Sequence, residues 1–153
     1  MTTKQTTMDS PLGPLTIITQ AGALTRIGFG GDPAAGPPDE AVRQLTAYFE
    51  GARTTFDLPL APAGTEFQQR VWAALDEIAY GETISYGELT ERIGAPRDRI
   101  RAVAAAVGAN PLLVVRPCHR VIGADGSLTG YAGGLDRKRE LLTLEGVLQP
   151  TLL

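Results

Sequence analysis

Two segments rich in glycine and proline divide this chain of 153 residues. The first, GGDPAAGPPD at residues 30–39, suits neither a helix nor a strand, because proline lacks a backbone donor and glycine favours irregular backbone. The second, APAG at residues 61–64, interrupts the chain again. These breaks predict two domains, residues 1–62 and residues 63–153, and an α+β fold.

The first domain is predicted to be a small α/β lobe with a short antiparallel sheet. Two stretches rich in β-branched residues indicate strands, GPLTIIT at residues 13–19 and LTRIGFG at residues 24–30, with a turn between them. The stretch EAVRQLTAYFEG, at residues 40–51, has apolar residues at helical spacing and ends in glycine. A further strand is expected at TFDLPL, residues 55–60.

The second domain is predicted to be mostly helical and similar to a winged helix. Thr65 and Gln68 form a capping box that opens a helix expected to end at Gly81. Ser85 and Glu88 form a second box, which opens a shorter helix. Pro96 precedes a third helix, so the last two helices and their tight turn indicate a helix-turn-helix.

The outer face of the third helix is expected to be smooth. Its expected buried stripe contains Ile100, Val103, Ala104 and Val107. Arg101 then lies at the edge of the opposite face. The other residues of that face are all small: Ala102, Ala105, Ala106 and Ala109. Such a face allows close approach to a DNA groove or to another helix.

The charge of the chain is unevenly distributed. The net charge of −3 argues weakly against a nucleic-acid partner. Residues 92–120, however, contain a single acid, Asp98, and six arginines: Arg92, Arg97, Arg99, Arg101, Arg116 and Arg120. This cluster indicates either contacts with phosphates or a solvated helix face, and charge alone does not decide between them.

The chain has one cysteine and one histidine, and they are neighbours in VVRPCHRVIG at residues 114–123. A single cysteine forms no internal disulfide, and the pair is too small a set for structural zinc. Cys118 therefore either fills space or reacts as a thiol. The N-terminus lacks the features of a signal peptide and no apolar run could span a bilayer, so we expect a cytoplasmic protein without membrane association.

Several motifs together resemble the O6-alkylguanine-DNA alkyltransferases, also called methylated-DNA–protein-cysteine methyltransferases. They match in order and spacing over residues 65–147: GTEFQQRVW, IAYGETISYGEL, IRAV, NP, PCHRVIG, GSLTGYAGG and RKRELLTLEG. The resemblance implies repair of DNA by stoichiometric transfer of an alkyl group from O6 of guanine to Cys118, and also from O4 of alkylated thymine. It implies that the nucleotide is flipped out of the duplex first, since O6 of a stacked base cannot be reached.

The same resemblance assigns the groups that activate the thiol. A free cysteine is mostly protonated at neutral pH, so a base must assist it. His119 matches that base, acting through a bridging water, and Glu145 matches the acid that orients the histidine. Glu145 also follows Leu141 at helical spacing on the apolar stripe, and a buried acid requires a partner.

Other family positions match residues that would bind the substrate. Tyr86 matches the residue that contacts the phosphate of the flipped nucleotide and donates to guanine N3, and Tyr131 matches the wall of the base pocket. Asn110 matches the hinge between the helix-turn-helix and the segment that contains Cys118, residues 114–123, which we call the acceptor segment. The groups that read the guanine edge match the backbone of Val115, Cys118, Val121 and Ala132. From the sequence alone, both tyrosines could equally be core aromatics.

The DNA contacts implied by the resemblance lie on the third helix. Arg101 matches the residue that fills the space left by the flipped base, with Ala102 and Ala105 on the face that enters the minor groove. Compared with most relatives, this chain has one extra residue between Pro96 and Arg101. Arg99 is therefore an alternative to Arg101 for this role. Duplex DNA containing O6-alkylguanine is the expected partner of a protein that is monomeric in solution, and cooperative binding along DNA stays open.

No cofactor and no metal are expected, since the zinc-binding residues of some relatives are absent. Two alternative functions fit these residues less well than repair does. A non-catalytic sensor of alkylated bases would carry another residue at the position of Cys118. A helix-turn-helix regulator would usually present polar side chains on its recognition helix, where this chain has alanines.

Overall fold

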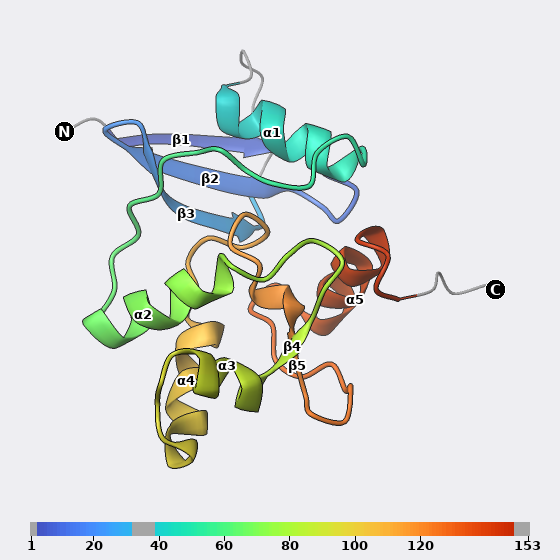
Figure 1. Cartoon of the computed structure of the whole chain (residues 1–153). Helices are drawn as coiled ribbons and strands as arrows, with labels where there is room; N and C mark the ends of the chain where they lie inside the picture. Colours follow the sequence, from blue (N-terminus) through green and yellow to red (C-terminus); the bar gives the residue numbers. More distant parts are fainter. Residues whose placement is uncertain (1–2, 32–38, 149–153) are drawn as a thin grey trace. The chain divides into compact units, whose positions relative to one another are not determined.

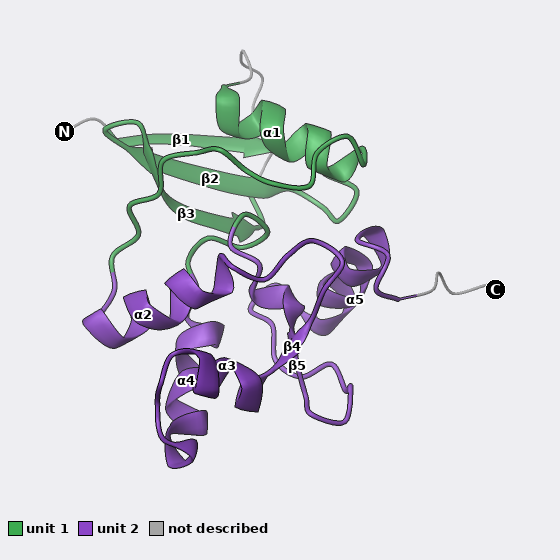
Figure 2. Ribbon diagram, in the orientation of Figure 1, with its two compact units in different colours: residues 1–63, 111–115 green, residues 64–110, 116–153 purple. Residues whose placement is uncertain are grey.

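The computed structural model describes residues 3–31 and 39–148. Most of the predicted loop at residues 30–39 lies outside the described residues. The chain forms two compact units, which Figure 2 shows in different colours. Unit 1 contains residues 1–63 and 111–115, and unit 2 contains residues 64–110 and 116–153.

Unit 1 is built on a three-stranded antiparallel sheet in the order β1-β2-β3 (Figure 1). Its strands are Thr3–Met8, Leu15–Gln20 and Ala23–Phe29. Strand β1 was not predicted, whereas β2 and β3 confirm the two expected strands. Helix α1, Glu40–Phe49, begins at Asp39, whose carboxylate accepts a hydrogen bond from the amide of Val42. The core of this unit includes Leu15, Ile17, Leu24, Ile27, Leu45 and Tyr48.

Two other segments of unit 1 pair with β3. Leu112 is bridged in parallel to Ile27, whose amide donates to the carbonyl of Pro111 at 2.8 Å. Leu60 is bridged in parallel to Leu24, but this is an isolated bridge. The strand predicted at TFDLPL was therefore wrong, because only one residue of that stretch enters a ladder.

Unit 2 is mostly helical, and its parts are ordered so that the acceptor segment follows the helix-turn-helix (Figure 1). The α-helices are α2 (Glu66–Leu75), α3 (Tyr86–Arg92), α4 (Ile100–Gly108) and α5 (Leu135–Leu144). Two 3-10 helices are η1 (Arg97–Arg99) and η2 (Cys118–Arg120). Two short parallel strands complete the unit, β4 (Ile84–Ser85) and β5 (Val121–Ile122).

Both predicted capping boxes are present. The hydroxyl of Thr65 accepts from the amide of Gln68, whose side chain accepts from the amide of Thr65. Ser85 and Glu88 make the same reciprocal pair at the start of α3. Each box satisfies two amides that have no partner within the helix.

Three details of the helical prediction were wrong. Helix α2 ends at Leu75, well before Gly81, because the chain turns at Asp76. Ala106 is buried rather than outward-facing, since its carbonyl accepts a hydrogen bond from the buried Trp72 indole at 2.8 Å. Ile100 is 39% exposed, because it begins α4 at the point where the chain leaves η1.

The α+β fold class is confirmed: a small antiparallel sheet with one helix is followed by a mostly helical part. Within residues 3–31 and 39–148, no helix has both the length and the apolar character required to cross a membrane.

Candidate active site

Cys118 begins η2 and is 4% exposed. Burial raises the pKa of its thiol to about 11, although a hydrogen bond from Asn110 and the charge of Lys138 act in the opposite direction. The thiol is therefore protonated at neutral pH. Reaction as a nucleophile requires a base that removes this proton once a substrate is in place.

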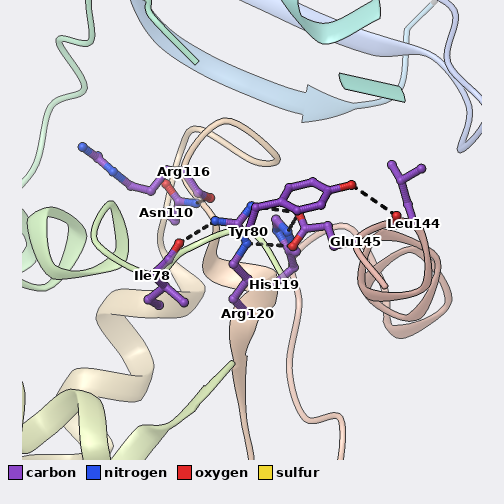
Figure 3. A network of polar contacts seen from close by, with 8 residues as sticks. All are labelled: Ile78, Tyr80, Asn110, Arg116, His119, Arg120, Leu144 and Glu145. Atoms are coloured by element: carbon purple, nitrogen blue, oxygen red, sulfur yellow. Dashed lines mark hydrogen bonds and ion pairs between the residues drawn. The ribbon is translucent and has the colours of Figure 1, made fainter. Parts of the chain in front are cut away.

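His119 and Arg120 form a buried ion network with Glu145, the C-cap residue of α5, which Figure 3 shows. Nε2 of His119 lies 2.7 Å from Oε2 of Glu145, and neither side chain is exposed to solvent. Arg120 donates to both oxygens of the same carboxylate, with Nε 2.7 Å from Oε1 and Nη2 3.0 Å from Oε2. Its remaining nitrogen, Nη1, donates to the carbonyl of Ile78.

This network sets the protonation of His119. Burial lowers the pKa of the imidazole, while the hydrogen bond and charge of Glu145 act to raise it. Since Arg120 already balances the charge of Glu145, we assign His119 as neutral, with its proton on Nε2 facing Glu145. Nδ1 is then the basic nitrogen, and it is buried with no hydrogen-bond partner among the described residues.

Asn110 lies at the end of the helix-turn-helix and contacts the acceptor segment. Its Nδ2 donates to the carbonyl of Arg116 at 3.1 Å, and its side chain is the hydrogen-bond partner that lowers the pKa of Cys118. The amide of Cys118 donates to the same carbonyl of Arg116 at 2.8 Å. The structure thus brings Asn110, Cys118, His119 and Glu145 together within unit 2.

Tyr131 and Val121 lie beside this cluster. The Tyr131 ring stands edge-on to His119, with centroids 6.5 Å apart and planes at 84°. Its hydroxyl is buried without a hydrogen-bond partner among the described residues, and burial raises its pKa well above the ordinary value. Val121 is buried at the start of β5, whereas Ala132 is exposed in the loop that follows Tyr131.

Lys138 was not singled out by sequence reasoning, yet it is fully buried in this unit. Its ammonium donates to three carbonyls, those of Val121 at 2.7 Å, Thr129 at 2.8 Å and Gly130 at 3.1 Å. Burial lowers its pKa to about 8. Lys138 therefore fixes the loop before Tyr131 to β5. In the sequence it is one of three consecutive cations, RKR at residues 137–139, and nothing there indicates this role.

The sequence indicates Arg120 only as one residue of a basic cluster, but in the structure it forms an ion pair with Glu145. A sequence signal existed for this role, since a buried acid needs a cation and Arg120 lies one residue after the predicted base.

Tyr86 and Arg101 line one hollow of about 410 Å³ together with Ile100, Ala104, Thr129 and Gly130. The hydroxyl of Tyr86 donates to the carbonyl of Thr129 at 3.0 Å. The hollow thus lies between the start of α3, the start of α4 and the loop held by Lys138. Its lining is mostly apolar and it is open to solvent.

Arg99 differs from Arg101 in its surroundings. Its guanidinium lies over the Phe67 ring, 5.3 Å from the centroid, and it does not line the hollow. Ala105 is exposed and Ala102 is half-buried on α4. Val115 belongs to unit 1, where its amide donates to the carbonyl of Leu113 at 2.9 Å, so its expected role in reading guanine stays a prediction.

Among the residues that the structure describes, no group of three or more His, Cys, Asp and Glu side chains is placed to hold a metal ion. Unit 2 contains one buried thiol, followed in the chain by an imidazole that is held by a carboxylate, and it also contains the hollow lined by Tyr86 and Arg101.

The chain matches two family models, and together they span most of its length. Residues 3–62 match the ribonuclease-like domain of 6-O-methylguanine DNA methyltransferase. Residues 66–147 match the DNA binding domain of the same family.

Two known proteins are similar to this chain over most of its length. The methylated-DNA–protein-cysteine methyltransferase of Mycobacterium tuberculosis strain H37Rv is 51% identical over 149 residues, covering 91% of this chain and 90% of that protein. The protein of the same name from Methanosarcina acetivorans is 49% identical, covering 90% of this chain and 95% of that protein.

Solved structures agree with the sequence comparison. A crystal structure of the Mycobacterium tuberculosis O6-methylguanine methyltransferase superposes with a TM-score of 0.85 at 48% identity, over 97% of this chain and 96% of that one. A structure of the Mycobacterium tuberculosis protein in complex with DNA gives a TM-score of 0.84 at 51% identity, over 92% and 91%. Family models, relatives and structures all confirm the resemblance found in the motifs, and this chain belongs to the 6-O-methylguanine DNA methyltransferase family.

Proposed function

We propose that Cys118 is the residue that accepts the alkyl group in this DNA-binding methylated-DNA–protein-cysteine methyltransferase, which repairs O6-methylguanine in DNA. The observation that carries the proposal is the buried network beside the thiol, in which Glu145 and Arg120 hold His119 with Nδ1 as a base. A cysteine that only filled space would not require a neighbouring imidazole whose Nδ1 has no hydrogen-bond partner among the described residues.

The reaction needs the proton of the thiol to leave as the new bond forms. Nδ1 of His119 takes this proton through a bridging water, and Sγ attacks the methyl carbon. The carbon–O6 bond breaks, and its electron pair leaves with the guanine as an anion. A hydrogen bond or proton at N3 of the ring then stabilises this leaving group.

Tyr86 is the donor proposed for N3. Its hydroxyl donates to the carbonyl of Thr129 in this structure, so it must turn toward the base when guanine enters the hollow. Tyr131 forms one wall for the base, and the backbone groups of Val115, Cys118, Val121 and Ala132 read its edge. Lys138 holds the carbonyls of Thr129 and Gly130 in place for this purpose.

DNA is proposed to bind through its minor groove on the face of α4 that carries Ala102 and Ala105. Small side chains there allow the helix to approach the groove without reading sequence. Arg101 lines the hollow beside Tyr86, which supports its role in filling the space left by the flipped nucleotide. Arg99 is engaged with Phe67 and is the weaker candidate.

The proposal also covers the oligomeric state, the location, the cofactors and a second substrate. The protein is proposed to act as a monomer in the cytoplasm on duplex DNA, without a cofactor or a metal, and O4-alkylthymine is a second proposed substrate.

Mass spectrometry after incubation with a duplex containing O6-methylguanine tests the proposal directly. We expect one methyl group on the peptide that contains Cys118, and loss of transfer with retained DNA binding in Cys118→Ala. A methyl group on any other residue would overturn the assignment of the acceptor.

A further inference from the structure

Arg116 is a buried cation two residues before Cys118, and the proposed reaction does not use its side chain. That side chain is 7% exposed and binds Asp76 through two contacts, Nε to Oδ1 at 3.1 Å and Nη2 to Oδ2 at 3.0 Å. The guanidinium also lies over the Trp72 ring, 5.7 Å from its centroid. A charge held this way resists rotation, since a planar guanidinium bound at two atoms has one favoured orientation.

The position of Asp76 makes this ion pair more than a chance contact. Asp76 is the C-cap of α2, and the last turn of that helix contains no basic residue. An acid at a helix C-terminus faces the negative end of the helix dipole and is unfavourable there. Arg116 brings the missing cation to this end of α2 from the acceptor segment.

The backbone of Arg116 holds the acceptor itself. Its carbonyl accepts one hydrogen bond from Nδ2 of Asn110 at 3.1 Å and another from the amide of Cys118 at 2.8 Å. Figure 3 shows Asn110 and Arg116 beside each other at the edge of the ion network. One residue therefore joins the end of α2, the end of the helix-turn-helix and the reacting cysteine.

We propose that Arg116 is a positioning residue for alkyl transfer. Its ion pair with Asp76 fixes the carbonyl that orients Asn110 and Cys118, and so holds Sγ on the line of attack. This inference rests on the proposed role of Cys118 as the acceptor. Transfer is sensitive to such geometry, because a displacement of about 1 Å at a reacting group can cost about 100-fold in rate.

A direct electrostatic effect on the thiol is the competing explanation. The charge of Arg116 is among the influences that lower the pKa of Cys118, but it is the smallest of them. If charge were the mechanism, removing Arg116 would raise the pKa of the thiol, and high pH would restore the rate. Loss of positioning instead lowers the rate by the same factor at every pH.

The test measures single-turnover transfer from a duplex containing O6-methylguanine to Arg116→Met, Asp76→Asn and the double variant. For each single variant we expect the limiting rate constant to fall about 10-fold to 100-fold, while the half-saturating DNA concentration changes by less than about threefold. The double variant should lose no more than the worse single variant, because both changes remove one interaction. Arg116→Lys should recover part of the rate, since lysine keeps the charge but not the two-point contact.

Val71→Ala is the matched control. Val71 is fully buried on α2, the helix that Asp76 caps, and is not part of the proposed site, so its truncation destabilises unit 2 while both partners of the Arg116–Asp76 pair remain. At a temperature where all variants are folded, Val71→Ala should keep the wild-type limiting rate.

The rate of Arg116→Met should fall by the same factor with free O6-benzylguanine as with duplex, since Arg116 makes no proposed contact with DNA.

Three results would overturn the proposal: a limiting rate in Arg116→Met within about twofold of wild type, an equal loss in Val71→Ala, or recovery of the rate at high pH. Mapping of the methylated peptide distinguishes failure of the positioning role of Arg116 from failure of the proposed acceptor role of Cys118. If wild-type protein is methylated at Cys118 and Arg116→Met is not slowed, only the positioning role fails. If wild-type protein is not methylated at Cys118, the acceptor assignment itself fails.

Discussion

His119 and Glu145 are joined by a hydrogen bond of 2.7 Å from which solvent is fully excluded. The carboxylate is also bound at both oxygens by Arg120, so it orients the imidazole without requiring it to carry a positive charge. The side of the ring that faces away from Glu145 is then the basic side. This arrangement gives the proposed site a base that is neutral at rest and fixed in one orientation.

Replacing His119 by Gln should slow transfer by about 100-fold to 10,000-fold, the usual range for loss of a general base. The Arg120–Glu145 ion pair remains in this variant, so the network keeps its charge balance. Single-turnover assays with a methylated duplex measure the rate, and binding of the same duplex should change little. A folded variant with the wild-type rate would remove His119 from the mechanism.

Replacing Glu145 by Gln should lower the stability of the folded protein as well as the rate of alkyl transfer. Arg120 would be left as a buried cation without its acid, and breaking one side of a buried ion pair typically costs about 3–5 kcal/mol. Urea unfolding monitors the change, with Glu140→Gln on the exposed face of α5 as the control. Equal stability of the two variants would show that the Arg120–Glu145 pair contributes nothing.

The stability of the protein should depend on pH through His119 on the acid side. The pKa of the folded imidazole lies below the ordinary 6.5, so between these values the unfolded chain binds a proton that the folded protein does not. The contribution of His119 is therefore complete above pH 6.5 and is lost as the pH falls through the folded pKa. Melting curves between pH 7.5 and 5 should show a decline that is smaller in His119→Gln.

On the alkaline side the same reasoning applies to Cys118 with the opposite sign. The pKa of the folded thiol is about 11, above its ordinary value of 9.0. Its contribution to stability is complete below pH 9 and is lost as the pH rises toward 11. Cys118→Ala should lack this part of the alkaline decline in urea unfolding measured from pH 8 to 10.5.

Replacing Arg101 by Ala should weaken repair of duplex DNA by about 10-fold to 100-fold, because nothing then offsets the unstacking of the flipped nucleotide. Transfer from free O6-benzylguanine should change far less, since a free base needs no flipping. Arg99→Ala is the internal control, and its effect should be small. A larger effect at Arg99 would exchange the proposed roles of the two arginines.

Each protein molecule should react once. A thioether is stable under mild conditions, and the chain has no second cysteine to displace the alkyl group. A methyl group added to the buried Cys118 should cost about 1–3 kcal/mol, which lowers the melting temperature by roughly 2–4 °C for each kcal/mol in a chain of this size. Titration with methylated duplex and melting of the product measure both effects; product beyond one equivalent would contradict a single-use acceptor.

Local signals in the sequence predicted much of the fold. The capping boxes at Thr65 and Ser85 were correct because both partners lie within three residues of each other. The end of α2 was missed, because apolar spacing continues to Ile78 while the backbone already turns at Asp76. Ala106 was placed on the wrong face because its burial depends on Trp72, a residue 34 positions away.

The residues of the candidate site could be predicted where they belong to a recognisable motif. They could not be predicted where their role depends on tertiary contacts. Cys118, His119 and Glu145 were named from motifs, and the structure brings them together. Lys138 looked like one of several surface cations on a helix, and only the fold shows that three loop carbonyls surround its ammonium. The partner of Arg116 was equally hidden, because Asp76 lies 40 residues earlier.

Neither unit is a continuous piece of chain, because residues 111–115 pair with β3 in unit 1 and are flanked by Asn110 and Arg116 of unit 2. A gene fragment that begins at residue 64 would encode this segment without the strand that it pairs with. A fragment that ends at residue 63 would leave the outer edge of β3 open, and an open sheet edge is a template for aggregation. Cutting the chain at the linker before α2 would therefore separate residues 111–115 from β3, and each fragment is expected to be less soluble than the whole chain.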